Sequence, residues 1–119
     1  MKAFKEFIEE AILFEMANFR PKSTGLKTTI FVSSGYVAGK LLFHGPRIKV
    51  SKIYTDKMNH LNTFTMTISD EPEVIGTHYL DSKDIDQIKD FIRLNKNVLL
   101  AYWDGEYDTS DLYGNLQKI

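Results

Sequence analysis

The chain has 119 residues, of which 43% are hydrophobic and 13% aromatic, so it can build one domain with a sizeable core and is not a disordered protein. It contains no cysteine, which excludes disulfides and thiolate metal sites and agrees with a reducing compartment. No apolar run approaches the ~20 residues that cross a bilayer, and no signal-peptide pattern opens the sequence. We therefore expect a cytoplasmic protein without a membrane partner.

The formal net charge of −1 conceals an uneven distribution of charged residues. Residues 16–69 carry eight basic side chains and one acid, whereas residues 70–119 carry eleven acids and five basic side chains. Two interpretations are open: a basic face that binds an anionic partner, or a basic sheet that is neutralised by an acidic helix packed against it.

Residues 2–17 have the period of an amphipathic helix, with glutamates opposite an apolar side. The apolar side is formed by Phe4, Phe7, Ile8, Ala11 and Ile12. We treat residues 1–17 as this helix and residues 18–119 as a single α+β domain. The helix either packs on the domain or serves as an arm for dimerisation or for a partner's groove.

Residues 18–27 are predicted to be a connector, because Pro21 and the following Ser-Thr-Gly favour turns. Four segments then have the composition or the alternation of strands. They are residues 28–34, 47–54, 63–69 and 73–80. In the second of them, Arg47 and Lys49 point away from Ile48 and Val50, which predicts a half-buried antiparallel strand with a basic outer face.

The longest helical period runs from Asp81 to Glu106 and includes the single tryptophan, Trp103. Asn95 falls where the apolar stripe should continue, so we expect a bend or two abutting helices. A short last helix is predicted at 111–118, after an N-cap signal. The order predicts an α+β fold, in which an antiparallel sheet of about four strands is covered by the N-terminal helix and the long C-terminal helix.

No motif for catalysis, phosphate binding or metal binding is present in the sequence. The three histidines, His44, His60 and His78, lack the spacing of metal ligands. Neither a GxSxG nucleophile motif nor a glycine-rich phosphate loop occurs. We therefore expect a non-enzymatic protein that uses no cofactor.

Two regions are candidates for a binding surface. The first is basic and could contact anionic groups; it comprises Arg20, Lys22, His44, Arg47, Lys49 and Lys52. The second surrounds Trp103, where aromatic residues stand among acids, as in many protein interfaces. The alternative for Trp103 is a buried ring that closes the C-terminus onto the sheet.

These candidates predict an interaction protein whose partner is another protein or a second copy of the chain. The alternative function is nucleic-acid binding by the basic strand face. Against this alternative, the basic face lacks the interleaved aromatic residues on which bases stack.

Three blocks resemble a group of small uncharacterised prokaryotic proteins that carry them in the same order: FRPKSTGL at 19–26, HGPRIKV at 44–50 and FIRLNKNVLLAYWDGEYDT at 91–109. The last block is also similar, more faintly, to the C-terminal helix of domains of unknown function found beside toxin–antitoxin genes. The resemblance covers about residues 18–119. It implies a cytoplasmic protein of a bacterium or mobile element with a compact α+β body, and it assigns no activity to any residue.

Overall fold

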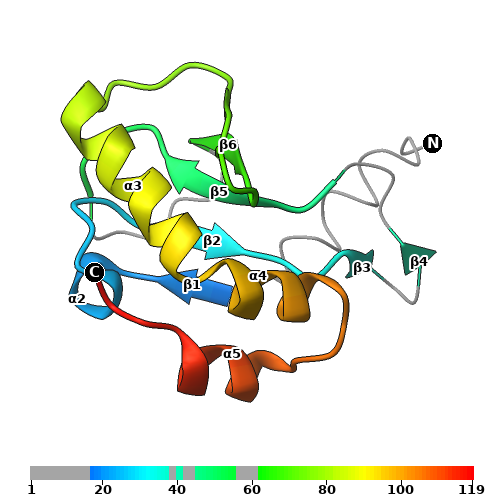
Figure 1. The fold of residues 1–119 in the computed structure, drawn as a ribbon. Coiled ribbons are helices and arrows are strands. Elements are labelled where there is room, and N and C mark those ends of the chain that lie inside the picture. The colour runs from blue at the N-terminus through cyan, green and yellow to red at the C-terminus, as the bar shows by residue number, and fades with distance from the viewer. Residues whose placement is uncertain (1–16, 38–39, 42–44, 56–61) are drawn as a thin grey trace.

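Five antiparallel strands form the main sheet, in the order β1-β2-β5-β6-β7 (Figure 1). The computed structural model describes residues 17–37, 40–41, 45–55 and 62–119. The strands of the main sheet are β1 (Ala17–Phe19), β2 (Ile30–Val32), β5 (Arg47–Ser51), β6 (Thr63–Thr67) and β7 (Val74–Ile75). A second sheet pairs β3 (Tyr36–Val37) with β4 (Lys40–Leu41). The protein is therefore α+β with an antiparallel sheet.

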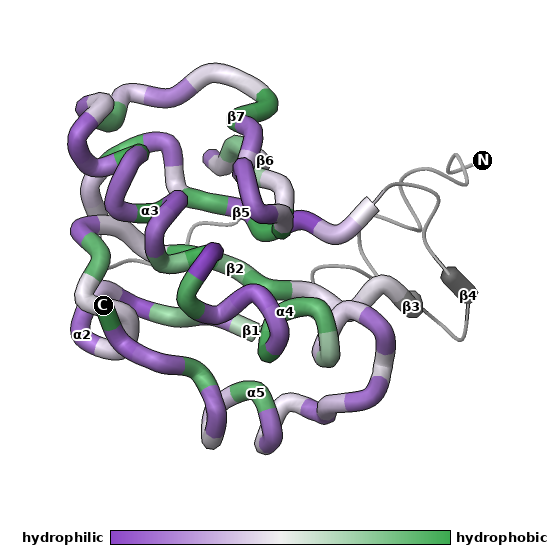
Figure 2. Tube along the Cα trace, in the orientation of Figure 1, coloured by the Kyte–Doolittle hydropathy of each residue, from purple (hydrophilic) through white to green (hydrophobic). Residues whose placement is uncertain are grey.

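Alternation along the central strands gives the main sheet one apolar face. Ile48 and Val50 of β5 are buried, and they lie beside Met66 and Phe64 of β6. Successive side chains of a strand point to opposite faces, so paired strands in register align their apolar residues. These side chains belong to one continuous core cluster. In Figure 2 the tube along β2 is accordingly hydrophobic.

In the part of the chain that the structure describes, three helices cover the apolar face of the sheet. They are α3 (Ser82–Leu94), α4 (Lys96–Trp103) and α5 (Thr109–Asn115). Each contributes buried apolar side chains to the same core cluster as the sheet, and α3 contributes the most. Among the described residues, no helix is both long enough and apolar enough to cross a membrane.

Asn95 separates α3 from α4, at the position where the apolar stripe is interrupted in the sequence. Its side-chain amide donates to the carbonyl oxygens of Phe91 at 3.1 Å and Gln117 at 2.9 Å. Its side-chain oxygen accepts the backbone amide of Gln117 at 2.6 Å. Asn95 is 1% exposed. The break between the two helices is therefore a buried polar clamp that holds the C-terminal segment.

The first part of the chain differs from the sequence-based expectation. Residues 17–19 were predicted as the end of a helix and the start of a connector, but they form the edge strand β1, which raises the strand count of the main sheet to five. The connector also contains a short helix, α2 (Pro21–Thr24). Proline at its first position suits a helix start, and Gly25 ends it with a φ of 82°. The remainder of the predicted N-terminal helix lies outside the described residues.

Two further predicted elements have different lengths. The strand predicted at 73–80 is reduced to β7, because Gly76 turns the backbone with a φ of 105°. The last helix begins earlier than expected, since Asp108 and Asp111 form a capping box at its start. The antiparallel pairing of the strands follows the prediction, whereas the number and the lengths of the elements differ in detail.

Candidate interaction surface

The sheet face that points away from α3, α4 and α5 presents a row of side chains from all five strands. The Cα pairing aligns Asn18, Phe31, Lys49, Thr65 and Ile75 across the sheet. A neighbouring pair on the same face joins β5 to β6 through Arg47 and Thr67. We call this surface the basic face, defined by Asn18, Phe31, Arg47, Lys49, Thr65, Thr67 and Ile75.

Arg47 and Lys49 supply the charge of the basic face. Both are half-buried, so their aliphatic stems lie along the strands while the charged heads reach solvent. Arg47 Nε donates to the carbonyl oxygen of Gly45 at 3.4 Å, a contact that leaves its charge uncompensated. Within the described part of the chain, neither side chain forms an ion pair.

The ion pairs of the described residues involve the helices instead. Asp90 pairs with Arg93 at 2.9 Å within α3. At the N-terminus of α3, Lys27 lies 3.5 Å from Asp84 and joins the basic part of the sequence to the acidic part. The interpretation in which the helix layer neutralises the sheet therefore finds no support at the basic face, because the sheet itself stands between the two layers.

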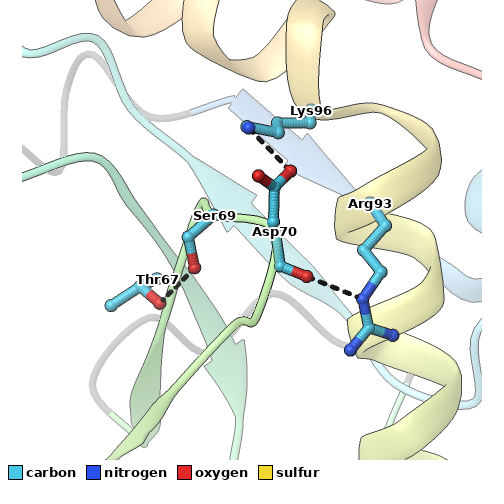
Figure 3. Close-up of polar contacts among 5 residues, drawn as sticks. All are labelled: Thr67, Ser69, Asp70, Arg93 and Lys96. Carbon is cyan, nitrogen blue, oxygen red and sulfur yellow. Dashed lines mark hydrogen bonds and ion pairs between the residues drawn. The ribbon is translucent and has the colours of Figure 1, made fainter.

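The turn after β6 shows how an acid is held by the helix layer (Figure 3). The Asp70 carboxylate accepts a hydrogen bond from Lys96 Nζ at 2.7 Å, and its backbone oxygen accepts one from Arg93 Nε at 2.9 Å. The hydrogen bond from Lys96 holds the pKa of Asp70 below its ordinary value of 3.8. The hydroxyls of Thr67 and Ser69 bond to each other at 3.2 Å and brace the same turn.

A second polar cluster fixes the N-terminus of α3. Tyr54 Oη donates to Asp84 Oδ2 at 2.5 Å and accepts the backbone amide of Asp81 at 2.8 Å. The hydrogen bond from Tyr54, together with the charge of Lys27, outweighs desolvation and lowers the pKa of Asp84. The Asp81 amide lowers the pKa of Tyr54, but the bond to Asp84 and desolvation together raise it above its ordinary value of 10.0.

A shallow cavity of about 250 Å³ opens beside this second cluster. It is lined by Lys27, Lys83, Asp84, Asp86, Gln87 and Asp90. Its least exposed carboxylate, Asp84, already has its hydrogen-bond donors. The described residues also contain no group of three or more side chains that could hold a metal ion. The cluster therefore serves to anchor α3 to the end of the sheet.

The structure brings together only some of the basic residues selected from the sequence. Arg47 and Lys49 share the basic face. Lys52 lies beyond the end of β5, where its carbonyl oxygen accepts the amide of Tyr79 at 2.9 Å. Arg20 and Lys22 are exposed at the end of β1, which is separated from β5 by β2. The prediction for His44 lies outside the described residues.

Trp103 does not lie on an exposed binding surface, because it is only 4% exposed. Gly35 allows this burial: a Cβ added to Gly35 would stand 2.6 Å from the indole ring. The Gly35 amide also donates to the carbonyl oxygen of Trp103 at 2.8 Å. The ring therefore packs against the segment that follows β2, in agreement with the alternative in which buried aromatics close the C-terminus onto the body.

Two residues of the basic face were missed by reasoning from the sequence. Asn18 was placed in a connector because three residues are too few to show a strand period. Ile75 was placed in a strand, but the two-residue period alone does not say which side of a strand faces the core. Only the pairing of Ile75 with Thr65 assigns it to the basic face.

Comparisons of the chain with protein-family models, with curated proteins and with solved structures give no match. The resemblance of the three sequence blocks stays a prediction. The geometry and charge of the basic face are the observations that bear on function.

Proposed function

We propose that the protein is a non-enzymatic interaction protein that binds an acidic segment of a protein partner on its basic face. The observation that carries this proposal is the state of Arg47 and Lys49, which have no ion-pair partner within the described residues. Both lie on the face opposite the acidic helices. A guanidinium can accept a carboxylate in a bidentate geometry, and an ammonium can add a second contact beside it.

The composition of the basic face favours a protein partner over a nucleic acid. It offers two cations within the described strands, whereas dedicated nucleic-acid surfaces neutralise many phosphates. Thr65 pairs with Lys49 on the neighbouring strand, and Ile75, which is 46% exposed, follows Thr65 one strand farther along the same row. An acidic segment with apolar residues among its carboxylates matches this combination, because apolar contacts at the core of an interface supply much of its energy.

The test uses two fluorescent peptide probes of equal length, one alternating glutamate with leucine and the other alternating lysine with leucine. Binding to the whole chain is followed by anisotropy. We expect the glutamate probe to bind and the lysine probe not to bind. The double variant Arg47→Gln/Lys49→Gln should weaken binding at least about tenfold, which corresponds to a loss of about 1.4 kcal/mol.

The matched control is Lys83→Gln/Lys118→Gln, which removes the same charge from exposed positions outside the basic face. It should bind like the unmodified chain. An equal loss in both double variants, or no binding of the glutamate probe, would refute the proposal. Short single- and double-stranded DNA is measured in parallel at ~50 and ~200 mM salt; tight binding that falls steeply with salt would identify nucleic acid as the partner instead.

A further inference from the structure

The connection between α4 and α5 is acidic, and we call residues 104–108 the acidic turn. Asp104, Glu106 and Asp108 place exposed carboxylates at alternate positions of this segment. No lysine, arginine or histidine occurs from residue 97 to residue 117. Within the described residues, none of the three acids forms an ion pair. The protein therefore carries an unpaired acidic segment as well as an unpaired basic face.

Two of these carboxylates stand where the electrostatics of a helix disfavour them. Asp104 is the C-cap of α4, and Glu106 follows two residues later. The C-terminal end of a helix carries a partial negative charge, which stabilises nearby cations and destabilises nearby anions. The last turn of α4 contains no basic residue that could offset this repulsion. A cation supplied from another surface would therefore relieve it.

Backbone hydrogen bonds fix the shape of the acidic turn. The carbonyl oxygen of Ala101 accepts the amides of Glu106 at 2.9 Å and of Tyr107 at 3.1 Å. Gly105 has a φ of 80°, which lets the chain reverse at the end of α4. Tyr107 packs against the core and ties the end of the turn to the body of the protein. Because the turn is already ordered, binding through its carboxylates costs little further conformational entropy.

The basic face offers a pair of cations with matching spacing. Arg47 and Lys49 are two residues apart on β5, so their side chains leave the same face of the strand about 6.8 Å apart. Among the described residues, Arg47 bonds only to the carbonyl oxygen of Gly45, through Nε, which leaves its two terminal nitrogens for a carboxylate. Asp104 and Glu106 are also two residues apart, so each cation can take one carboxylate.

The acidic turn and the basic face of one chain lie on different sides of the sheet. The turn joins two helices of the layer that covers the apolar face, whereas the basic face points away from that layer (Figure 1). No ion pair of the described residues joins the two surfaces within one chain. A contact between them needs a second copy, and because the two surfaces differ, that contact is heterologous and joins copies head to tail.

We propose that the acidic turn of one copy binds the basic face of a second copy, with Asp104 and Glu106 on Arg47 and Lys49. This inference rests on the proposed function, because it names the chain's own turn as the acidic segment. Each copy offers one turn and one face, so the assembly grows as the protein concentration rises. It weakens as salt rises, because its ion pairs lie at the surface.

Sedimentation equilibrium of the whole chain tests the association at ~50 and ~200 mM salt. At the lower salt, the average mass should rise with concentration above the mass of one chain, and at the higher salt it should rise less. Arg47→Gln/Lys49→Gln removes the cations, and Asp104→Ser/Glu106→Gln removes the carboxylates. Each double variant should weaken self-association at least about tenfold.

The matched control is Glu71→Gln/Asp86→Ser, which removes two acids from exposed positions outside both surfaces. It should associate like the unmodified chain. An equal loss in this control, or a mass that still rises in the variant without Arg47 and Lys49, would overturn the proposal, because the association would then use other groups.

Mixing the two surface variants tests the head-to-tail geometry. The variant without the cations keeps its acidic turn, and the variant without the carboxylates keeps its basic face. Together they should form a complex of one copy of each that grows no further, and a mixture that stays monomeric would contradict the contact. If the glutamate probe binds the basic face but the unmodified chain stays monomeric at ~50 mM salt, only this inference fails; if neither binding nor association occurs, the proposed function fails with it.

Discussion

Tyr54, three residues beyond the end of β5, donates a hydrogen bond to the carboxylate of Asp84, thirty residues later in the chain, and lowers the pKa of that carboxyl. The carboxylate lies where α3 begins, and Lys27 approaches it from the connector before β2. Three parts of the chain therefore meet at one ionised group. A carboxylate held in this way stabilises the fold only while it stays ionised.

The pH dependence of stability follows from the direction of this pKa shift. Because the folded pKa of Asp84 lies below its ordinary value of 3.8, the ionised group stabilises the fold above that value, and the contribution is lost as the pH falls through the folded pKa. Tyr54→Phe removes the hydrogen bond, so the pKa of Asp84 should rise and acid unfolding should begin at a higher pH. Urea unfolding between about pH 2 and pH 7 measures this shift.

The control for this prediction is Tyr79→Phe. Tyr79 is 75% exposed, and its hydroxyl makes no hydrogen bond within the described residues. Its removal should leave the pH profile unchanged. The explanation fails if both variants show the same profile.

At the scale of the elements, the sequence predicts the helices and strands whose hydrophobic pattern is visible in their own residues. The alternation of 47–51 and of 63–67 is visible without any partner, and both segments are strands. The three residues of β1 have no such signal, because their strand geometry depends on pairing with β2. For the same reason, the basic face was only partly predictable: the outward direction of Arg47 and Lys49 follows from periodicity, whereas their neighbours follow from register.

The break at Asn95 shows the same limit within a helix. The interruption of the apolar stripe is local and predicts a break. Besides the nearby carbonyl of Phe91, Asn95 contacts the backbone of Gln117, which is 22 residues away and has no periodic pattern that points to it. The sequence therefore predicts where the helix stops, and the structure shows what the polar side chain does there.

Asn95→Ala should destabilise the protein by about 2–3 kcal/mol, because a buried side chain with three hydrogen bonds is lost and the Gln117 backbone is released. Urea unfolding measures the loss, and hydrogen exchange should become faster at the Gln117 amide. Asn97→Ala, at an exposed position of α4, is the matched control and should change stability by less than about 0.5 kcal/mol. Similar losses for the two variants would show that the clamp does not stabilise the fold.

At the scale of the whole molecule, the two charged blocks of the sequence lie on two sides of one sheet. Arg47 and Lys49 project from one face, while Asp84 and Asp90 of α3 lie on the helix side and pair with Lys27 and Arg93. The apolar core cluster, formed by residues of the sheet and the helices, lies between these two groups of charges. Charge separation of this kind leaves an outward field on the basic face, which can steer an acidic partner toward it.

Reversing the charge of the basic face distinguishes this arrangement from internal neutralisation. If the described acids do not compensate the face, Arg47→Glu and Lys49→Glu should each change the free energy of unfolding by no more than about 0.5 kcal/mol. Lys27→Glu is the comparison, because it places a second negative charge next to Asp84 and should cause a clearly larger loss. If the basic face were neutralised by the helices, all three reversals would create like-charge contacts and destabilise the protein alike. Urea unfolding of the three variants decides between the two arrangements. The measurement is made at ~50 mM salt, because rising salt increasingly screens exposed charges that lie farther apart than the Debye length, which is ~10 Å at 0.1 M.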